Sequence, residues 1–166
     1  MNKRILSILV ENTAGVLSRV SGLFSRRGYN IDSLSVGITT DPNYSRMTVV
    51  CRGDELILEQ ITKQVEKLED VLTVKVLKDG QSVNRELILV KVRVEPEQRP
   101  SISSIVDIFR ANIIDVSSDS MVIELTGDQS KLKAFIDLVK AYDILELART
   151  GETGLSRGDK DVKFIK

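Results

Sequence analysis

The residues best suited to bind a ligand lie in the loop at residues 12–15, with the sequence Asn-Thr-Ala-Gly. The loop leads from a short apolar run into an amphipathic segment, so it lies at the N-terminus of a predicted helix. Unpaired backbone N–H groups and the positive end of the helix dipole can hold a carboxylate there, and Gly15 allows the backbone to approach a ligand closely. The amide oxygens of Asn12 and Asn30 can accept hydrogen bonds from an ammonium group. These chemistries together suit a small zwitterionic ligand.

An apolar wall beside such a ligand could come from Val16 or Ile31, with Ala14 as a further neighbour. The same residues are also ordinary components of turns, because loop residues more often turn the chain than bind a ligand. Asn30, for example, could simply follow the end of the helix. The residues alone leave both interpretations open.

The composition removes several classes of catalytic site. The 166-residue chain contains no histidine, which excludes Ser-His-Asp and Cys-His nucleophile systems, histidine general bases and histidine metal ligands. Residues 154–158 match the G-x-S-x-G motif of hydrolases, but no helix is predicted after them and no histidine can deprotonate Ser156. Clustered carboxylates such as Glu66, Glu69 and Asp70 lack a defined ligand set and are typical of a solvated helix end. We expect no catalytic site and no metal site in this chain.

Charge and cysteine content indicate where the chain works. Lys plus Arg (24) equals Asp plus Glu (24), so no long-range field favours nucleic acid or anionic lipid. No apolar run approaches the roughly 20 residues of a membrane-spanning helix, and the N-terminal apolar run has no signal-peptide cleavage site. The single cysteine, Cys51, has no partner for an intramolecular disulfide. We expect a cytoplasmic protein that binds neither nucleic acid nor membrane.

Hydrophobic periodicity predicts the same order of elements twice. Segments with apolar residues at helical spacing lie between segments with strand-like alternation, and polar turns separate the segments. In the first half the predicted elements are strand Ile5–Val10, helix Val16–Arg27, strands Leu34–Ile38 and Arg46–Cys51, helix Leu58–Leu68 and strand Leu72–Val76. In the second half they are strand Glu86–Val94, helix Ile102–Phe109, strands Ile113–Val116 and Met121–Leu125, helix Leu132–Val139 and strand Ile144–Leu147.

The repeated βαββαβ order predicts an α+β fold of two tandem ferredoxin-like domains. Each domain would be a four-stranded antiparallel sheet with two helices on one face. We place the first domain at residues 1–78, a linker at 79–84 and the second domain with its tail at 85–166. Asp54 is a predicted helix N-cap, and Asp128 repeats it at the matching position of the second half.

Several strands, such as Ile5–Val10, are apolar on both faces, although the predicted helices cover only one face of each sheet. An uncovered apolar sheet face favours association. We therefore infer that at least one sheet is extended or covered by another chain, which favours an oligomer. The alternative is that the two sheets of one chain pack on each other, and the two arrangements can coexist. The RNA-recognition domain shares the βαββαβ order, but it requires base-stacking aromatics on its third strand, and Arg46–Cys51 has none.

Four runs of the sequence carry a family resemblance: Arg4–Val20, Gly22–Leu34, Ser45–Thr48 and the tail Thr153–Lys160. They closely resemble the regulatory (small) subunits of acetolactate synthase, also called acetohydroxyacid synthase, and the match spans nearly the whole chain without a large insertion. The resemblance implies that the first domain is an ACT domain, a ferredoxin-like module that binds amino acids. It implies that the second is a C-terminal domain of related topology.

The resemblance also implies a noncatalytic chain that activates the catalytic (large) subunit of acetolactate synthase and confers feedback inhibition by valine in branched-chain amino-acid biosynthesis. The chain itself would hold no cofactor, and thiamine diphosphate, Mg and FAD would belong to the catalytic subunit. Valine would bind between the ACT domains of a homodimer. The site residues carried over are Asn12, Gly15 and Asn30, with Ala14, Val16 and Ile31 as weaker assignments. The alternative is a free-standing ACT-type amino-acid sensor that regulates another enzyme.

Overall fold

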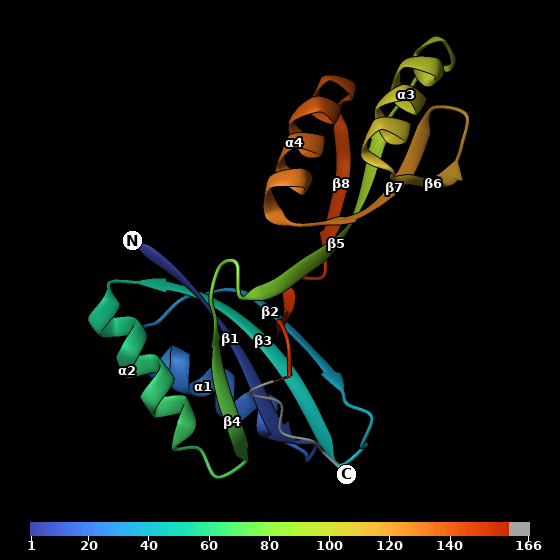
Figure 1. Cartoon of the computed structure of the whole chain (residues 1–166). Helices are drawn as coiled ribbons and strands as arrows, with labels where there is room; N and C mark the ends of the chain where they lie inside the picture. The colour runs from blue at the N-terminus through green and yellow to red at the C-terminus, as the bar shows by residue number, and fades with distance from the viewer. Residues whose placement is uncertain (160–166) are drawn as a thin grey trace. The chain divides into compact units, whose positions relative to one another are not determined.

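The computed structural model describes residues 1–159, so the end of the predicted tail, from Lys160 onward, lies outside the described residues. The chain divides into two compact units, which are labelled by element in Figure 1. The first unit consists of Met1–Asn84 and the segment that begins at Glu152, and the second consists of Arg85–Gly151. Each unit contains the predicted βαββαβ order, which confirms the α+β, ferredoxin-like fold.

The first unit is one antiparallel sheet with both of its helices on the same face (Figure 1). Its strands are ordered β2-β3-β1-β4, so β2 and β4 are the edges. The elements are β1 (Asn2–Glu11), α1 (Val16–Arg26), β2 (Ile31–Ile38), β3 (Tyr44–Gly53), α2 (Glu55–Glu66) and β4 (Val71–Leu77).

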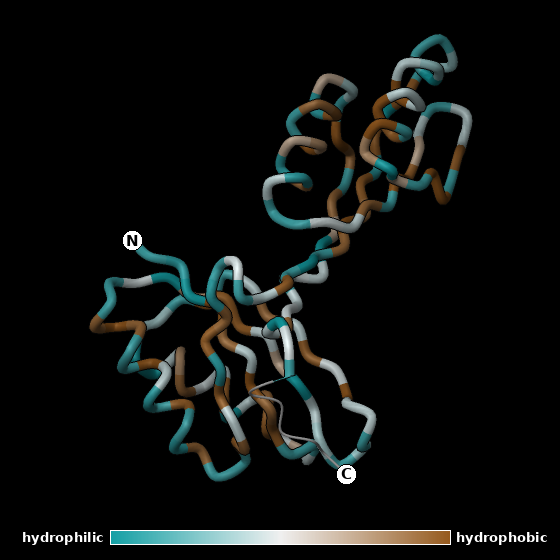
Figure 2. Tube along the Cα trace, viewed as in Figure 1, coloured by the Kyte–Doolittle hydropathy of each residue, from teal (hydrophilic) through white to brown (hydrophobic). Residues whose placement is uncertain are grey.

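Strand β1 is buried on both faces, as its apolar run predicts. Successive side chains of a strand point to opposite faces. Leu6 and its alternate neighbours therefore join the core beneath the helices, which includes Phe24 of α1. Ile5 faces the other way and forms a separate buried cluster with Val50 and Leu77. Figure 2 shows the same hydrophobic segments along the central strands.

Helix capping explains why α2 and α4 begin where they do. The Asp54 carboxylate accepts a hydrogen bond from the Ile57 N–H at 2.8 Å, and the Asp128 carboxylate accepts one from the Lys131 N–H at 2.9 Å. Both predicted N-caps are confirmed, and each satisfies one backbone donor of the first helical turn. Helix α1 differs, because its N-cap residue is Gly15 and no side chain caps it.

The second unit repeats the first in its own sheet, with the order β6-β7-β5-β8. Its core includes an edge-to-face contact between Phe109 and Phe135, with ring centroids 5.4 Å apart. None of the helices described in residues 1–159 is long and apolar enough to span a membrane. The elements are β5 (Ser82–Arg93), the short 3-10 helix η1 (Pro96–Gln98), α3 (Arg99–Phe109), β6 (Asn112–Val116), β7 (Ser120–Gly127), α4 (Gln129–Val139), the 3-10 helix η2 (Lys140–Tyr142) and β8 (Ile144–Arg149).

The domain boundaries differ from the expected ones at two places. Residues 82–84, expected as linker, are the first residues of the long strand β5, which starts in the first unit and continues into the second. The expected tail of the second domain instead returns to the first unit, where Thr153–Ser156 forms β9 and pairs with β5. A four-residue strand that contains a glycine leaves little periodicity to recognise in a sequence.

The helix-free face of the first sheet is covered in part by β9, which lies against β3 and β4. The apolar face that predicted either a second chain or sheet-on-sheet packing therefore receives a segment of its own chain. The cluster of Ile5, Val50 and Leu77 is buried on this face without any partner molecule.

Candidate functional site

The loop after β1 is held in place by the side chain of Asn12. Its amide nitrogen donates to the Pro42 carbonyl at 2.8 Å, and its amide oxygen accepts from the Ser45 hydroxyl at 3.1 Å. The Asn12 N–H donates to the Asn43 carbonyl at 2.7 Å. Asn12 therefore has a structural role in joining this loop to the β2–β3 turn, and its amide oxygen keeps a second acceptor position.

The N-terminus of α1 has features that suit a carboxylate. Gly15 has a φ of 86°, in the left-handed region that favours glycine. No side chain caps the helix and its first turn contains no acidic residue, so the helix dipole is not neutralised there. Ala14 lies in the same exposed loop.

Arg19 is a residue that the sequence interpretation missed. Its guanidinium lies over Gly15, where Nη1 would be 2.9 Å from an added Cβ, and it bonds to the Asp70 carboxylate. That hydrogen bond raises the pKa of Arg19, so the group keeps its positive charge beside the loop. The spacing of four residues from Gly15 places both on one helix face and could have pointed to it.

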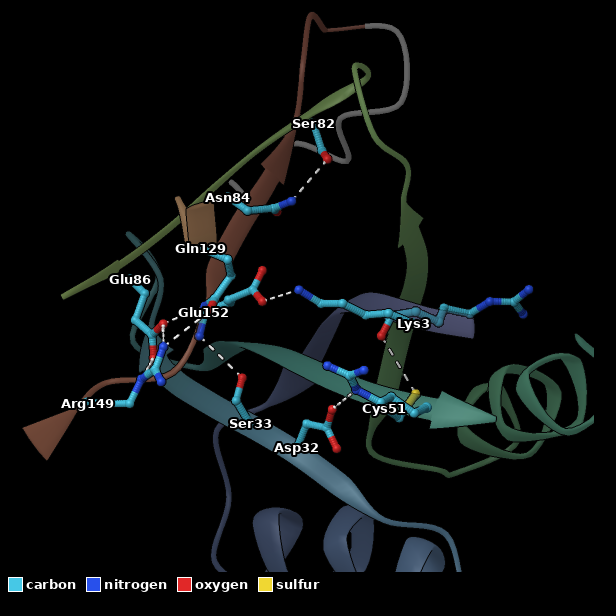
Figure 3. A network of polar contacts seen from close by, with 12 residues as sticks. Lys3, Asp32, Ser33, Cys51, Ser82, Asn84, Glu86, Gln129, Arg149 and Glu152 are labelled. Atoms are coloured by element: carbon cyan, nitrogen blue, oxygen red, sulfur yellow. Dashed lines mark hydrogen bonds and ion pairs between the residues drawn. The ribbon is translucent and has the colours of Figure 1, made fainter. Parts of the chain in front are cut away.

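Asn30 lies just before β2 and is exposed. Its amide nitrogen donates to the Asp32 carboxylate at 3.1 Å, and Asp32 is in turn paired with Arg52 (Figure 3). Within residues 1–159, nothing donates a hydrogen bond to the Asn30 amide oxygen. That oxygen is therefore available as an acceptor for a ligand ammonium group.

The structure does not bring Asn12 and Asn30 together within one chain. Both β1 and β2 run antiparallel to β3, so they are parallel to each other. The register aligns Ile31 with Cys51 and Cys51 with Arg4. Asn30 is thus level with the start of β1, whereas Asn12 follows its end. At about 3.3 Å per residue, the two positions are roughly 30 Å apart along the strands.

The two apolar candidates are placed differently. Val16 is 3% exposed and packs in the core beneath the helices, so it does not face a ligand at the surface. Ile31 is half-buried at the start of β2 and packs against the same core. Of the two, only Ile31 offers accessible apolar surface.

Two nucleophile candidates have no catalytic surroundings. Burial raises the pKa of the Cys51 thiol to about 11, so little thiolate forms near neutral pH. Ser156 lies in strand β9 rather than at a strand-to-helix turn, which is where the G-x-S-x-G motif of hydrolases places its nucleophile. Within the described part of the chain, no three acidic or cysteine side chains gather to hold a metal ion.

The second unit contains one buried carboxylate. Arg149 donates two hydrogen bonds to the Glu86 side chain, at 3.0 and 2.8 Å, and the Gln129 amide donates a third (Figure 3). The Glu86 side chain is only 3% exposed. Burial opposes its charge, but the hydrogen bonds from Arg149 and Gln129 outweigh burial and hold the pKa of Glu86 below its usual value. All three residues belong to one unit, so this cluster stabilises the fold there.

Comparison with known proteins connects both units to one family. A family model described as "AHAS small subunit-like ACT domain" matches residues 6–73, and one described as "Small subunit of acetolactate synthase" matches residues 85–158. A relative named "Probable acetolactate synthase small subunit", from Archaeoglobus fulgidus, is 51% identical over 158 residues, covering 95% of this chain and 99% of the relative. This chain belongs to the family of acetolactate synthase small subunits.

Two further relatives agree with this assignment over almost the full length. The protein of Escherichia coli named "Acetolactate synthase isozyme 3 small subunit" is 50% identical over 159 residues, which is 95% of this chain and 98% of the relative. The crystal structure of the acetolactate synthase small subunit from Thermotoga maritima matches with a TM-score of 0.88 at 40% identity. That alignment covers 96% of this chain and 99% of the Thermotoga chain. The family assignment gives this chain a regulatory role in the enzyme.

Proposed function

We propose that this chain binds valine between the ACT units of a homodimer and so makes the catalytic subunit of acetolactate synthase sensitive to feedback inhibition. In the absence of valine, it activates that subunit. The observation that carries the proposal is the separation of Asn12 and Asn30 to opposite ends of one sheet. Neither end alone offers both the ammonium acceptor of Asn30 and the carboxylate site at α1.

A second copy of the chain would bring an Asn30 close to the loop at residues 12–15. Strand β2 is an edge of its sheet and exposes Val36 (49%) and Ile38 (69%). An apolar edge strand is a template for pairing with another chain. If two β2 edges pair antiparallel, the start of one β2 lies beside the end of the other. Asn30 of one copy then lies at the same end of the joined sheet as the loop at residues 12–15 of the other copy.

Each half of the proposed site recognises one part of the amino acid. The uncapped N-terminus of α1, with Gly15 and the positive charge of Arg19, holds the carboxylate. The Asn30 amide oxygen accepts from the ammonium group, and Ile31 beside it contacts the branched side chain. Binding across two chains makes valine a ligand of the dimer interface, which gives it differential affinity for one quaternary state.

The chemistry of acetolactate formation belongs to the partner in this proposal. The catalytic subunit would hold thiamine diphosphate, Mg and FAD, and the assembly would work in the cytoplasm. The small subunit contributes binding and transmission only.

Reconstitution tests the proposed function directly. Adding this chain to its purified catalytic subunit is expected to raise the rate of acetolactate formation from pyruvate, and valine is expected to lower it again. The isolated chain should form no acetolactate. A chain that binds valine but leaves the catalytic subunit unchanged would instead be a sensor for another enzyme.

A further inference from the structure

The C-terminal segment Glu152–Ser156 is fastened to the helix-free face of the ACT sheet by contacts from several strands. The Glu152 side chain is 8% exposed and forms an ion pair with Lys3 of β1 (Figure 3). Its N–H donates to the Ser33 hydroxyl at 3.2 Å, and its carbonyl accepts from the Ser35 hydroxyl at 3.0 Å. Two residues of β2 thus hold the backbone of one buried glutamate. We call Glu152–Ser156 the strap.

The strap continues across the sheet in close contact with it. The Gly154 N–H donates to the Thr48 hydroxyl at 3.3 Å. A Cβ added to Gly154 would lie 2.1 Å from the Asn84 amide oxygen and 2.7 Å from a methyl carbon of Leu77. Only glycine allows the strap to lie this close to the sheet. Beyond it, the Arg157 N–H donates to the Gln81 carbonyl at 2.8 Å.

The strap is hydrogen-bonded to β2, the strand that begins beside the proposed effector site. Asn30 and Ile31 precede Ser33 and Ser35 on β2, and the pairing of β2 with β3 shifts register between Ile31 and Ser33. Irregular pairing of this kind weakens the local ladder. Because β2 is an edge, β3 is its only partner strand among residues 1–159. The strap adds a separate set of hydrogen bonds to β2, and these lie on the sheet face rather than at its edge.

We propose that the strap transmits occupancy of the effector site to the second unit, with Glu152 as the positioning residue that couples it to β2. The proposal rests on the proposed function. The chain crosses between the two units only within β5 and between Gly151 and Glu152. A shift of β2 caused by valine therefore acts, through Ser33 and Ser35, on a residue directly bonded to the second unit. Valine binding and its effect on the catalytic subunit then become separable properties.

Three substitutions loosen the strap in different ways. Glu152→Gln keeps the shape but removes the charge that pairs with Lys3, and Lys3→Gln removes the same ion pair from the other side. Gly154→Ala introduces the close contacts with Asn84 and Leu77. The matched control is Leu155→Ala, because that side chain is 59% exposed and its removal leaves the backbone contacts of the strap in place.

Two measurements, one on the full chain and one on the reconstituted enzyme, test whether the strap couples valine binding to inhibition. Calorimetry with valine gives the dissociation constant for each small-subunit variant, and acetolactate formation gives the valine concentration for half-inhibition. We expect the three strap variants to change the dissociation constant less than about twofold while raising the half-inhibitory concentration at least about fivefold, a typical allosteric coupling. Leu155→Ala should match the wild type in both.

Hydrogen exchange adds a readout that does not depend on activity. In the wild type, valine should slow exchange in β2 and in the strap together, whereas in Gly154→Ala it should slow exchange in β2 alone. If Gly154→Ala does not fold, the same measurements are made on Glu152→Gln and Lys3→Gln.

Three outcomes would overturn the proposal. Unchanged half-inhibition in variants whose strap exchanges faster would show that the strap transmits nothing. Loss of valine affinity in these variants would make the strap part of the binding site itself. Failure of valine to bind the wild-type chain would overturn the proposed function, and this inference with it.

Discussion

Replacing Asn30 by alanine is expected to weaken valine binding by roughly 10- to 100-fold. The substitution removes an acceptor for a charged ammonium group, and hydrogen bonds to charged groups contribute about 1.5–3 kcal/mol. The stability of the free chain should change by less than about 0.5 kcal/mol, because Asn30 is exposed and its described hydrogen bond joins only Asp32. Calorimetry and a thermal melt of the same sample measure the two effects.

Asn112→Ala is the matched control for this variant. Asn112 is likewise an exposed asparagine at the start of an edge strand, but it lies in the second unit. Its replacement should leave valine affinity at the wild-type value. Equal affinities in wild type, Asn30→Ala and Asn112→Ala would remove Asn30 from the site.

Replacing Arg149 by methionine is expected to destabilise the second unit by about 3 kcal/mol. The change leaves the Glu86 carboxylate, which is 3% exposed, without its ion-pair partner, and breaking a buried pair in this way is costly. Tyr142 is the only tyrosine of this unit, so in a background where Tyr29 and Tyr44 are replaced by phenylalanine, tyrosine fluorescence in urea reports unfolding there. The control Lys91→Met breaks an exposed pair with Glu146 and should cost less than about 1 kcal/mol.

The ion pair of Glu86 and Arg149 should make the stability of the second unit fall as the pH falls. Because the folded pKa of Glu86 lies below its usual value of 4.5, its contribution is present above that pH and is lost as the pH falls further. In Arg149→Met, the hydrogen bonds and the charge of Arg149 no longer lower the pKa of Glu86. Burial then raises this pKa, so the carboxyl can become neutral. The gap in stability between wild type and variant should therefore begin to narrow as the pH falls toward 4.5 and should continue to narrow below it. A gap that is constant with pH would contradict an ionised Glu86.

Local patterns were sufficient to predict most of the fold. Apolar spacing located the helices and strands of both units, and Asp54 and Asp128 marked the starts of α2 and α4 correctly. These features depend on residues within a few positions of one another, where helix and strand periodicity and side-chain caps act.

Contacts between distant segments could not be predicted in this way. The strap depends on Lys3 and Ser33, which lie 149 and 119 residues from Glu152. No spacing rule links them, so the C-terminal segment was expected to remain with the second domain. The candidate site has the same difficulty, because its residues are close in sequence yet lie at opposite ends of the sheet. Only the strand order shows that Asn12 and Asn30 of one chain are too far apart to contact the same small ligand.

This arrangement separates three tasks within one small chain. In the proposed mechanism, the loop before α1 and the start of β2 would bind the effector, the edge of β2 would join two copies, and the strap would connect β2 to the last residue of the second unit. A regulatory subunit needs all three properties, since a ligand acts on a partner only through its differential affinity for two states. None of them requires a nucleophile or an acid-base residue of its own.

Mixing two defective variants tests the shared site most directly. Asn12→Ala should loosen the loop that binds the carboxylate, and Asn30→Ala removes the ammonium acceptor. Homodimers of either variant should therefore lack tight valine binding, because every site carries one substitution. In a mixed dimer, one site carries both substitutions and the other carries neither. Calorimetry after mixing and exchange of equal amounts should therefore recover wild-type affinity at about a quarter of all sites. Absence of any tight site in the mixture, with both variants folded and dimeric, would contradict binding across two chains.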